Sequence, residues 1–233
     1  MKKKLLFIIP WCLFAIAFII CIYTTNRDGL IHTVLAKLSI INEEPVYSDE
    51  YHSWSNCLEQ LNISCDIAFI GDSITANGNF AEYFPELSVC NLGCYGDTIV
   101  DLESRVEQLS AVSPSKVFIM IGTNSLGCRT LKQCEQEYSE MISLISSTVP
   151  SADLYFLSVL PVSDSAILGA RNNKNICIFN QFIQNTVKDM EYTYIDLYSA
   201  YETDGTLNPS MTSDGLHITS YDLWIDSIRR YIN

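Results

Sequence analysis

Three residues of this chain have the types that nucleophilic catalysis requires. Ser73 ends the tripeptide Gly71-Asp72-Ser73, which directly follows the apolar run of residues 67–70. Asp214 and His217 stand far downstream, separated by two residues. An imidazole can take the proton of a hydroxyl that attacks an acyl group, and a carboxylate can hold that imidazole. We therefore expect Ser73 to be the nucleophile, His217 the base and Asp214 the group that orients the base.

The assignment of His217 as the base follows by elimination. The other two histidines, His32 and His52, both precede the first strand that the sequence predicts. Asp214 lies three positions before His217, close enough for its carboxylate to accept the Nδ1 proton and leave Nε2 facing Ser73. Asp72 is adjacent to the serine, so we expect its side chain to point elsewhere and to support the loop.

Two further residues could hold the negative charge that develops on the substrate oxygen. Gly93 has no side chain, so its backbone N–H could approach that oxygen closely. Asn124 could donate its side-chain amide to the same atom. Each residue also has an ordinary structural interpretation, a turn glycine for Gly93 and a strand-end cap for Asn124. The two become informative only together with Ser73 and His217.

The elements that would position these residues alternate along the chain. Apolar runs predict strands at residues 66–70, 87–91, 116–121, 154–160 and 194–197. Helical periodicity predicts helices at residues 98–109, 131–148, 175–190 and 221–232. Strands separated by helices indicate right-handed βαβ units and a parallel sheet that is covered on both faces. The segments that end at Ser73, Gly93 and Asn124 follow three successive strands, so they should meet at one edge of the sheet.

Together the polar segments resemble the sequence blocks of the SGNH, or GDSL, hydrolase family. Gly71-Asp72-Ser73 resembles block I, Asn91-x-Gly93-x-x-Gly96-Asp97 block II, Gly122-x-Asn124 block III, and Asp214-x-x-His217 block V. They occur in the family's order and cover about residues 65 to 233. The nucleophile-elbow pattern Gly-x-Ser-x-Gly is absent around Ser73, which argues against an ordinary α/β-hydrolase.

The resemblance implies a flavodoxin-like, three-layer α/β/α fold and a serine esterase. The sequence contains no cluster of metal ligands, so we expect no metal or other cofactor. Carried over by position, the resemblance implies Ser73, His217 and Asp214 as catalytic residues. It also implies an oxyanion hole made by the Ser73 N–H, the Gly93 N–H and the Asn124 side chain. One departure is visible, because Ser125 stands where block III commonly has an aspartate. The hydrogen bonding that orients Asn124 must therefore differ from the usual pattern.

The N-terminus has the pattern of a membrane anchor. Residues 1–4 contain three lysines, and residues 5–23 are continuously apolar. Roughly 19 residues at ~1.5 Å per residue span about 28 Å, enough to cross a bilayer. The lysines predict a cytoplasmic N-terminus and an extracytoplasmic remainder. A cleaved signal peptide is the alternative. We expect a single transmembrane helix, a juxtamembrane linker at residues 24–64 and a catalytic domain at residues 65–233.

Charge and cysteine content narrow the class of partner. All 27 acidic residues and 11 of the 14 basic ones lie after residue 23. Such a negative surface disfavours nucleic-acid binding, which needs a positive footprint.

Seven of the nine cysteines also lie after residue 23, and Cys57/Cys65, Cys90/Cys94 and Cys128/Cys134 are candidate disulfides. No cysteine or histidine spacing typical of a zinc site is present, and nothing indicates an obligate protein partner.

These observations predict a membrane-anchored, extracytoplasmic serine esterase that removes acyl groups, including acetyl groups, from a small-molecule, glycan or lipid ester. The alternatives are an O-acyltransferase acting on glycans, a lysophospholipase or thioesterase, and a non-catalytic surface domain. The loops at residues 161–173 and 202–213 follow strands on the reactive edge, so we expect them to shape the substrate pocket.

Overall fold

A computed structural model describes residues 64–232 of the chain. The predicted anchor at residues 5–23 and the predicted linker up to residue 63 lie outside the described residues. Within residues 64–232, no helix combines the length and the apolar character needed to cross a membrane.

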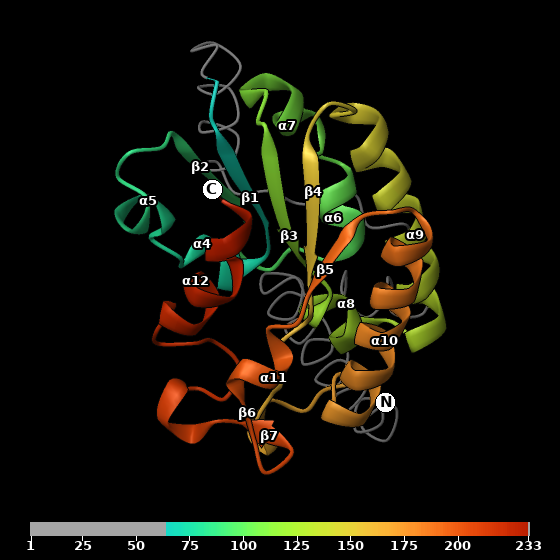
Figure 1. Ribbon diagram of the computed structural model, residues 1–233. Helices are drawn as coiled ribbons and strands as arrows, with labels where there is room; N and C mark the ends of the chain where they lie inside the picture. The colour runs from blue at the N-terminus through green and yellow to red at the C-terminus, as the bar shows by residue number, and fades with distance from the viewer. Residues whose placement is uncertain (1–63, 233) are drawn as a thin grey trace, which may run out of the picture. The chain divides into compact units, whose positions relative to one another are not determined.

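The described part is built on a sheet of five parallel strands (Figure 1). The strands are β1 (Ile67–Gly71), β2 (Val89–Gly93), β3 (Lys116–Met120), β4 (Asp153–Leu157) and β5 (Thr193–Ile195). Their order across the sheet is β2-β1-β3-β4-β5, and every neighbouring pair is parallel. This is the flavodoxin-like order, in which ligands bind at the carboxyl ends of the strands, near the switch point between β1 and β3. The predicted α/β fold with a parallel central sheet is confirmed.

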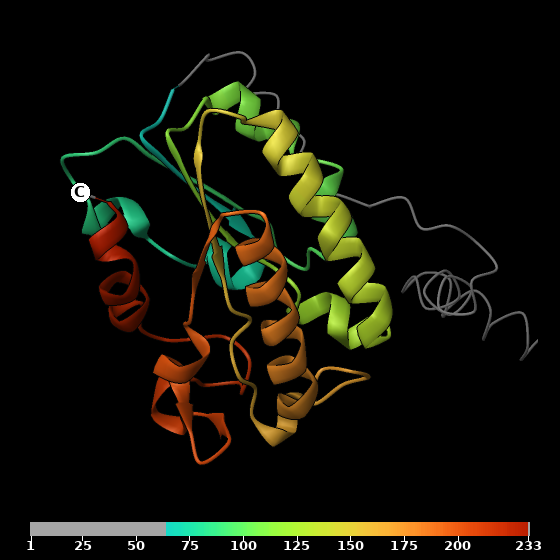
Figure 2. The same ribbon diagram turned by 45° about the vertical axis from the view of Figure 1, so that its right-hand side comes forward.

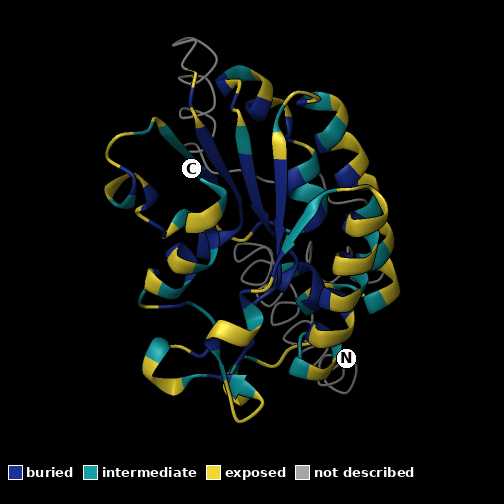
Figure 3. Ribbon diagram, in the orientation of Figure 1, coloured by how far each residue is buried: buried dark blue, intermediate teal, exposed yellow. Residues whose placement is uncertain are grey.

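The three central strands are apolar because both of their faces are buried. Side chains alternate along β1, so that Ala68 and Ile70 enter one core cluster and Ile67 and Phe69 enter the other. Figure 3 shows these strands as the buried centre of the domain, with the exposed residues on the outer surfaces of the helices.

Helices cover the two faces of the sheet in separate groups (Figures 1 and 2). The cluster around Ala68 and Ile70 is covered by α6 (Ile99–Glu103), α7 (Glu107–Val112), α9 (Leu131–Thr148) and α10 (Asn173–Asp189). The cluster around Phe69 is covered by α4 (Ser73–Ala76), α5 (Phe80–Tyr83), α11 (Tyr198–Tyr201) and α12 (Asp222–Ile228). The result is a three-layer α/β/α arrangement.

The remaining elements are short. They are α8 (Thr123–Cys128), the hairpin β6 (Glu202–Thr203) and β7 (Thr206–Leu207), and the 3₁₀ turns η1 (Asp164–Ala166), η2 (Pro209–Met211) and η3 (Arg229–Tyr231). The sequence patterns predicted none of these as separate elements, because each is only a few residues long.

Several predicted boundaries need correction. The helix predicted at residues 98–109 is interrupted at residues 104–106 and forms α6 and α7. A capping box formed by Thr98 and Asp101 begins α6. β2 is Val89–Gly93 rather than residues 87–91, so Gly93 ends the strand instead of following it. β4 ends at Leu157 rather than at residue 160, and the hydroxyl of Ser158 after it accepts hydrogen bonds from the backbone N–H groups of Leu197 and Tyr198.

Candidate active site

The three predicted catalytic side chains form a hydrogen-bonded row. Ser73 Oγ lies 2.8 Å from His217 Nε2, although the two residues are 144 positions apart in the chain. His217 Nδ1 lies 2.6 Å from Asp214 Oδ2. With Nδ1 protonated and bound to the carboxylate, Nε2 is free to accept the serine proton. The geometry is that of a nucleophile, a base and a carboxylate that orients the base.

The loop from Asp214 to His217 holds its own carboxylate in place. Asp214 Oδ1 accepts hydrogen bonds from the backbone N–H groups of Leu216 at 2.9 Å and His217 at 2.8 Å. Gly215 permits this turn because its φ is +84°, a conformation that costs other residues free energy. The hydrogen bond from the His217 side chain is the main reason that the pKa of Asp214 lies below its ordinary value. The carboxylate therefore stays ionised wherever the histidine can act as a base.

Ser73 is presented by the short helix α4, which begins directly after β1. Asp72 is the N-cap of this helix, and its Oδ1 accepts a hydrogen bond from the Ile74 N–H at 2.9 Å. Asp72 is completely buried, and this burial raises its pKa to about 7. As predicted, Asp72 supports the loop and does not belong to the catalytic row. As the first residue of α4, Ser73 also has a backbone N–H without an intrahelical partner.

The far end of α4 is held by Asn91, a residue whose role the sequence did not reveal. Asn91 Nδ2 donates to the carbonyl of Thr75 at 2.9 Å and to that of Gly78 at 2.8 Å. Asn91 Oδ1 accepts from the Gly93 N–H at 2.9 Å. This asparagine in strand β2 therefore fixes the helix that presents Ser73.

Gly93 differs from its predicted role in one respect. Its N–H, expected to face the substrate oxygen, donates to Asn91 Oδ1. The structure shows another reason for a glycine here, because a Cβ atom on Gly93 would lie 2.2 Å from the backbone N of Ala76. Strand β2 can approach α4 this closely only without a side chain at that position.

Gly96 lies in the turn that follows β2 and also lacks a side chain. It has a φ of +83°, and a Cβ atom there would meet nothing within 4 Å. Within residues 64–232, its N–H donates to no protein acceptor. Gly96 therefore presents an open backbone N–H next to Asp97, whose carbonyl contacts Asn124.

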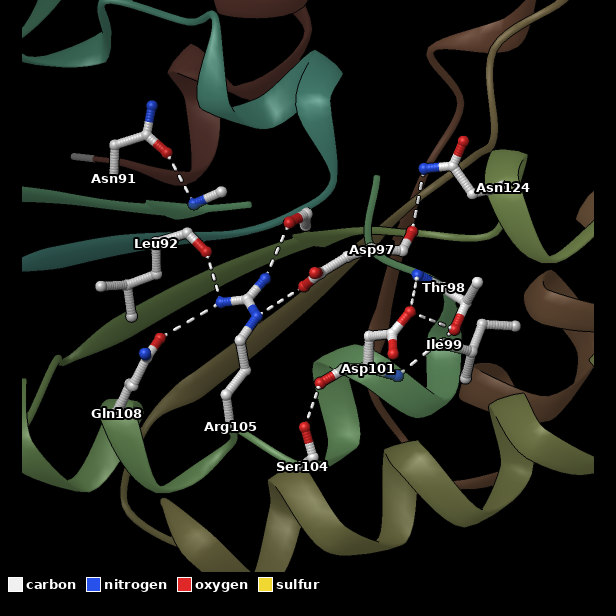
Figure 4. A network of polar contacts seen from close by, with 12 residues as sticks. Asn91, Leu92, Asp97, Thr98, Ile99, Asp101, Ser104, Arg105, Gln108 and Asn124 are labelled. Carbon is white, nitrogen blue, oxygen red and sulfur yellow. Dashed lines mark hydrogen bonds and ion pairs between the residues drawn. The ribbon is translucent and has the colours of Figure 1, made fainter. Parts of the chain in front are cut away.

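Asn124 is the second residue of the short helix α8 after β3, and its amide faces the turn after β2 (Figure 4). Its Nδ2 donates to the carbonyl of Asp97 at 3.0 Å. The amide nitrogen carries two hydrogens, so this bond leaves one for a substrate oxygen.

Ser125, the departure noted in the sequence, is completely buried beside Asn124. Its hydroxyl accepts a hydrogen bond from the Ile99 N–H at 2.8 Å. Ser125 thus ties the start of α8 to the start of α6. This bond connects the segment of Asn124 with the segment that follows the turn after β2. Ser125 therefore helps to hold the Asn124 segment in place at the position where block III commonly has an aspartate.

The loop at residues 161–173 lies against the parts of the chain that carry Asn124 and His217. The Gly215 carbonyl accepts a hydrogen bond from the Ser163 N–H at 2.9 Å. A Cβ atom on Gly169 would lie 2.7 Å from the carbonyl oxygen of Gly127 in α8. Ile167 and Leu168, in the same loop, expose 48% and 53% of their surface. These contacts are consistent with the prediction that the loop at residues 161–173 shapes the substrate pocket.

The cysteines of the described region are all free thiols: Cys65, Cys90, Cys94, Cys128, Cys134 and Cys177. The candidate disulfides Cys90/Cys94 and Cys128/Cys134 are therefore not formed, and Cys57 lies outside the described residues. The neighbouring Cys90 thiol, followed by burial, raises the pKa of the Cys65 thiol.

A flavodoxin-like sheet with a hydrogen-bonded serine, histidine and aspartate at its carboxyl edge defines a domain of the serine hydrolase class. The comparisons with known proteins give the family. Residues 69–221 match the model of the GDSL-like Lipase/Acylhydrolase family, and the chain belongs to this family. It is a carboxylic ester hydrolase.

The relatives include esterases of bacterial origin. The chain is 22% identical to a multidomain esterase from Ruminococcus flavefaciens over 182 residues, which are 72% of this chain but only 23% of that protein. A GDSL-like lipase from Bacteroides thetaiotaomicron has the same fold, with a TM-score of 0.66 and 22% identity over 79% of this chain and 96% of that one. An acetyl-xylooligosaccharide esterase from Geobacillus has a TM-score of 0.58 and 23% identity over 73% of this chain and 95% of that one.

Proposed function

We propose that this chain is a serine esterase, anchored in the membrane and facing away from the cytoplasm, that hydrolyses acetyl esters of carbohydrates through an acyl-enzyme on Ser73. The observation that carries the proposal is the row formed by Ser73 Oγ, His217 and Asp214, with contacts of 2.8 Å and 2.6 Å. This row supplies each group that acyl transfer to a serine requires.

The reaction proceeds in two halves. His217 Nε2 takes the proton of Ser73 as Oγ attacks the ester carbonyl, and the resulting imidazolium is stabilised by Asp214. The imidazolium then gives its proton to the departing alcohol oxygen, which leaves the acyl group on Ser73. In the second half, His217 removes a proton from water, and the hydroxide attacks the acyl carbon. The bond between the acyl carbon and Ser73 Oγ then breaks, the His217 imidazolium returns the proton to Oγ, and the carboxylic acid is released.

The tetrahedral intermediate needs hydrogen-bond donors for its oxygen. We assign the Ser73 N–H and the second hydrogen of Asn124 Nδ2 to this role. We assign the third donor to the Gly96 N–H rather than to the predicted Gly93 N–H, because the Gly93 N–H is bound to Asn91 Oδ1. Gly93 could donate only if this bond broke.

Hydrolysis is favoured over acyl transfer by the openness of the site. The side chain of His217 is 32% exposed and that of Asp214 is 49% exposed. Water therefore has direct access to the base that must activate it.

Two observations support a carbohydrate ester as the substrate. One structural relative is an acetyl-xylooligosaccharide esterase. In addition, Tyr95 lies in the turn after β2 and is 68% exposed, with its hydroxyl bonded to Asn77 one helical turn after Ser73. The hydrogen bond holds the ring in place, and an aromatic ring held with an open face can pack against the C–H groups of a sugar.

The decisive test is turnover by Ser73→Ala. The wild-type protein should release acetate from acetylated xylo-oligosaccharides and should react with a fluorophosphonate, and Ser73→Ala should do neither. Retention of turnover by the variant would refute the nucleophile assignment. Fatty acid release from lysophosphatidylcholine at a higher rate than acetate release would replace the carbohydrate ester with a lipid.

The location is tested separately from the chemistry. In intact cells or spheroplasts, a protease added from outside should degrade the domain at residues 64–232, and the N-terminus should remain protected. Recovery of the intact full-length chain in the soluble fraction would contradict the anchor at residues 5–23.

A further inference from the structure

The side chain of Arg105 hydrogen-bonds to three segments at the active-site edge of the sheet, namely the end of β1, the end of β2 and the turn after β2. Arg105 lies in the break between α6 and α7, and its side chain is only 1% exposed. Its Nε donates to Asp97 Oδ2 at 2.5 Å, and its Nη2 donates to the Gly71 carbonyl at 2.8 Å. Its Nη1 donates to the Leu92 carbonyl at 2.6 Å and to Gln108 Oε1 at 3.2 Å (Figure 4). These bonds use four of the five N–H groups of the guanidinium.

Three of the four acceptors of Arg105 lie in segments that carry active-site residues. Gly71 is the last residue of β1 and lies two positions before Ser73. Leu92 lies near the end of β2, just before the turn that contains Gly96. Asp97 follows Gly96, and its own carbonyl accepts the hydrogen bond from Asn124. One planar group therefore connects the segment of the nucleophile with the segment of the oxyanion donors.

The charge of Arg105 cannot act on the substrate directly, because the guanidinium is buried. Its charge is balanced by Asp97, which is 3% exposed. A guanidinium holds its donors in a fixed plane, whereas a lysine ammonium is a single point on a flexible chain. A lysine at this position could satisfy the charge of Asp97, but it could not hold two strand ends and the turn at the same time.

We propose that Arg105 is a positioning residue that sets the distance between Ser73 and the oxyanion donors of the turn after β2. The inference rests on the proposed function, since it concerns the oxyanion site of that reaction. Arg105 touches no substrate and acts only through Gly71, Leu92 and Asp97. A misplacement of about 1 Å between reacting groups can lower a rate by about 10²-fold.

The test compares Arg105→Lys with the wild type by three measurements. The first is kcat/KM for p-nitrophenyl acetate. The second is the inhibition constant of a trifluoromethyl ketone, whose adduct with Ser73 places an oxyanion in the site. The third is the inhibition constant of the corresponding alcohol, which binds without forming an adduct. We expect kcat/KM to fall about 10²-fold, ketone binding to weaken in parallel, and alcohol binding to remain within about threefold.

Met141→Ala is the matched control for lost stability. Met141 is completely buried in α9, on the face of the sheet opposite α4, so its truncation destabilises the fold without touching the site. This variant should lower the melting temperature and leave both kcat/KM and ketone binding unchanged. If Arg105→Lys behaves in the same way, Arg105 is a stabilising residue only, and the proposal is wrong.

A double variant gives an independent criterion. Arg105→Lys should add less than about threefold to the loss caused by Asn124→Ala, because Arg105 holds Asp97, and the Asp97 carbonyl positions the Asn124 amide. Fully multiplicative losses would overturn the proposal. If Arg105→Lys does not fold, Asp97→Asn takes its place, since it keeps the size of the side chain and removes its charge. The same three measurements then decide, with the same expected results.

Failure of this proposal differs from failure of the proposed function. If the wild-type protein and Ser73→Ala are equally inactive on all esters, the function is wrong. If the wild-type protein is active and Arg105→Lys retains its kcat/KM and ketone binding, only the positioning role is wrong.

Discussion

The substitution Gly93→Ala tests whether the close approach of β2 to α4 positions the nucleophile. A Cβ atom at this position would lie 2.2 Å from the backbone N of Ala76, 2.6 Å from its Cα and 2.7 Å from the carbonyl carbon of Thr75. All three are backbone atoms of α4, so no side-chain rotation can relieve the contact. Ordinary van der Waals contact begins at 3.4 Å, and α4 must therefore retreat by about 1.2 Å.

This displacement sets the expected size of the effect. Ser73 belongs to the same helical turn, so its Oγ moves away from His217 Nε2 as the helix shifts. A shift of about 1 Å in a reacting group costs about 10² in rate, and overpacking costs about 1–3 kcal/mol of stability. We therefore expect Gly93→Ala to lose about 10²-fold in kcat/KM for p-nitrophenyl acetate, with a lower melting temperature.

The stability control is again Met141→Ala, which should lower the melting temperature and keep its kcat/KM. The decisive comparison is made well below the melting temperature of either variant, where both are folded. If folded Gly93→Ala works within about threefold of the wild type, then α4 adapts without moving Ser73, and the argument from close packing is refuted.

Three further predictions concern single side chains. Asn124→Ala should lower kcat by ~10²–10³, because one oxyanion donor is lost; a matching loss of affinity for a trifluoromethyl ketone would identify the cause. Asp214→Asn should reduce kcat less than His217→Ala, because the backbone of the loop still holds the imidazole in part; the opposite order in steady-state kinetics would mean that the two roles are misassigned. Asp72→Asn should stabilise the protein more at pH 8 than at pH 5. Burial raises the pKa of Asp72 to about 7, so between about pH 4 and pH 7 the folded state binds more protons than the unfolded state, and its stability falls as the pH rises. The difference, on the order of a few kcal/mol, can be measured by urea unfolding at the two pH values. An equal effect of Asp72→Asn at both pH values would show that the buried carboxyl does not titrate in this range.

The residues of the catalytic row could be predicted from short stretches of sequence and from the elimination of the other two histidines. Asp214 and His217 are three residues apart, and Ser73 directly follows an apolar run that forms a strand. The parallel sheet also follows from a general rule, since alternating strands and helices favour parallel pairing.

The position of β2 could not be predicted, because its limits depend on tertiary contacts. Asn91 is polar and reads as the end of a strand, but its amide is satisfied by carbonyl groups around the end of α4. The strand therefore continues to Gly93, and the Gly93 N–H meets Asn91 instead of the substrate site.

The role of Arg105 could not be predicted either, because it also depends on tertiary contacts. In the sequence it is one charged residue within a helical pattern, and such residues usually lie on the exposed face. Its burial depends on acceptors 8, 13 and 34 positions earlier in the chain, which no local pattern relates to it. The break between α6 and α7 is the only sign of it in the secondary structure of this region.

The separation of 144 residues between Ser73 and His217 has a consequence for the timing of activity. During synthesis the serine, its helix and strands β1 to β5 are all made before the histidine appears. The nucleophile therefore has no base until the last part of the fold has formed, because contacts between distant residues close late. Reaction of Ser73 with a fluorophosphonate during refolding should accordingly report completion of the whole domain, at a time when a spectroscopic signal from the helices has already reached its final value.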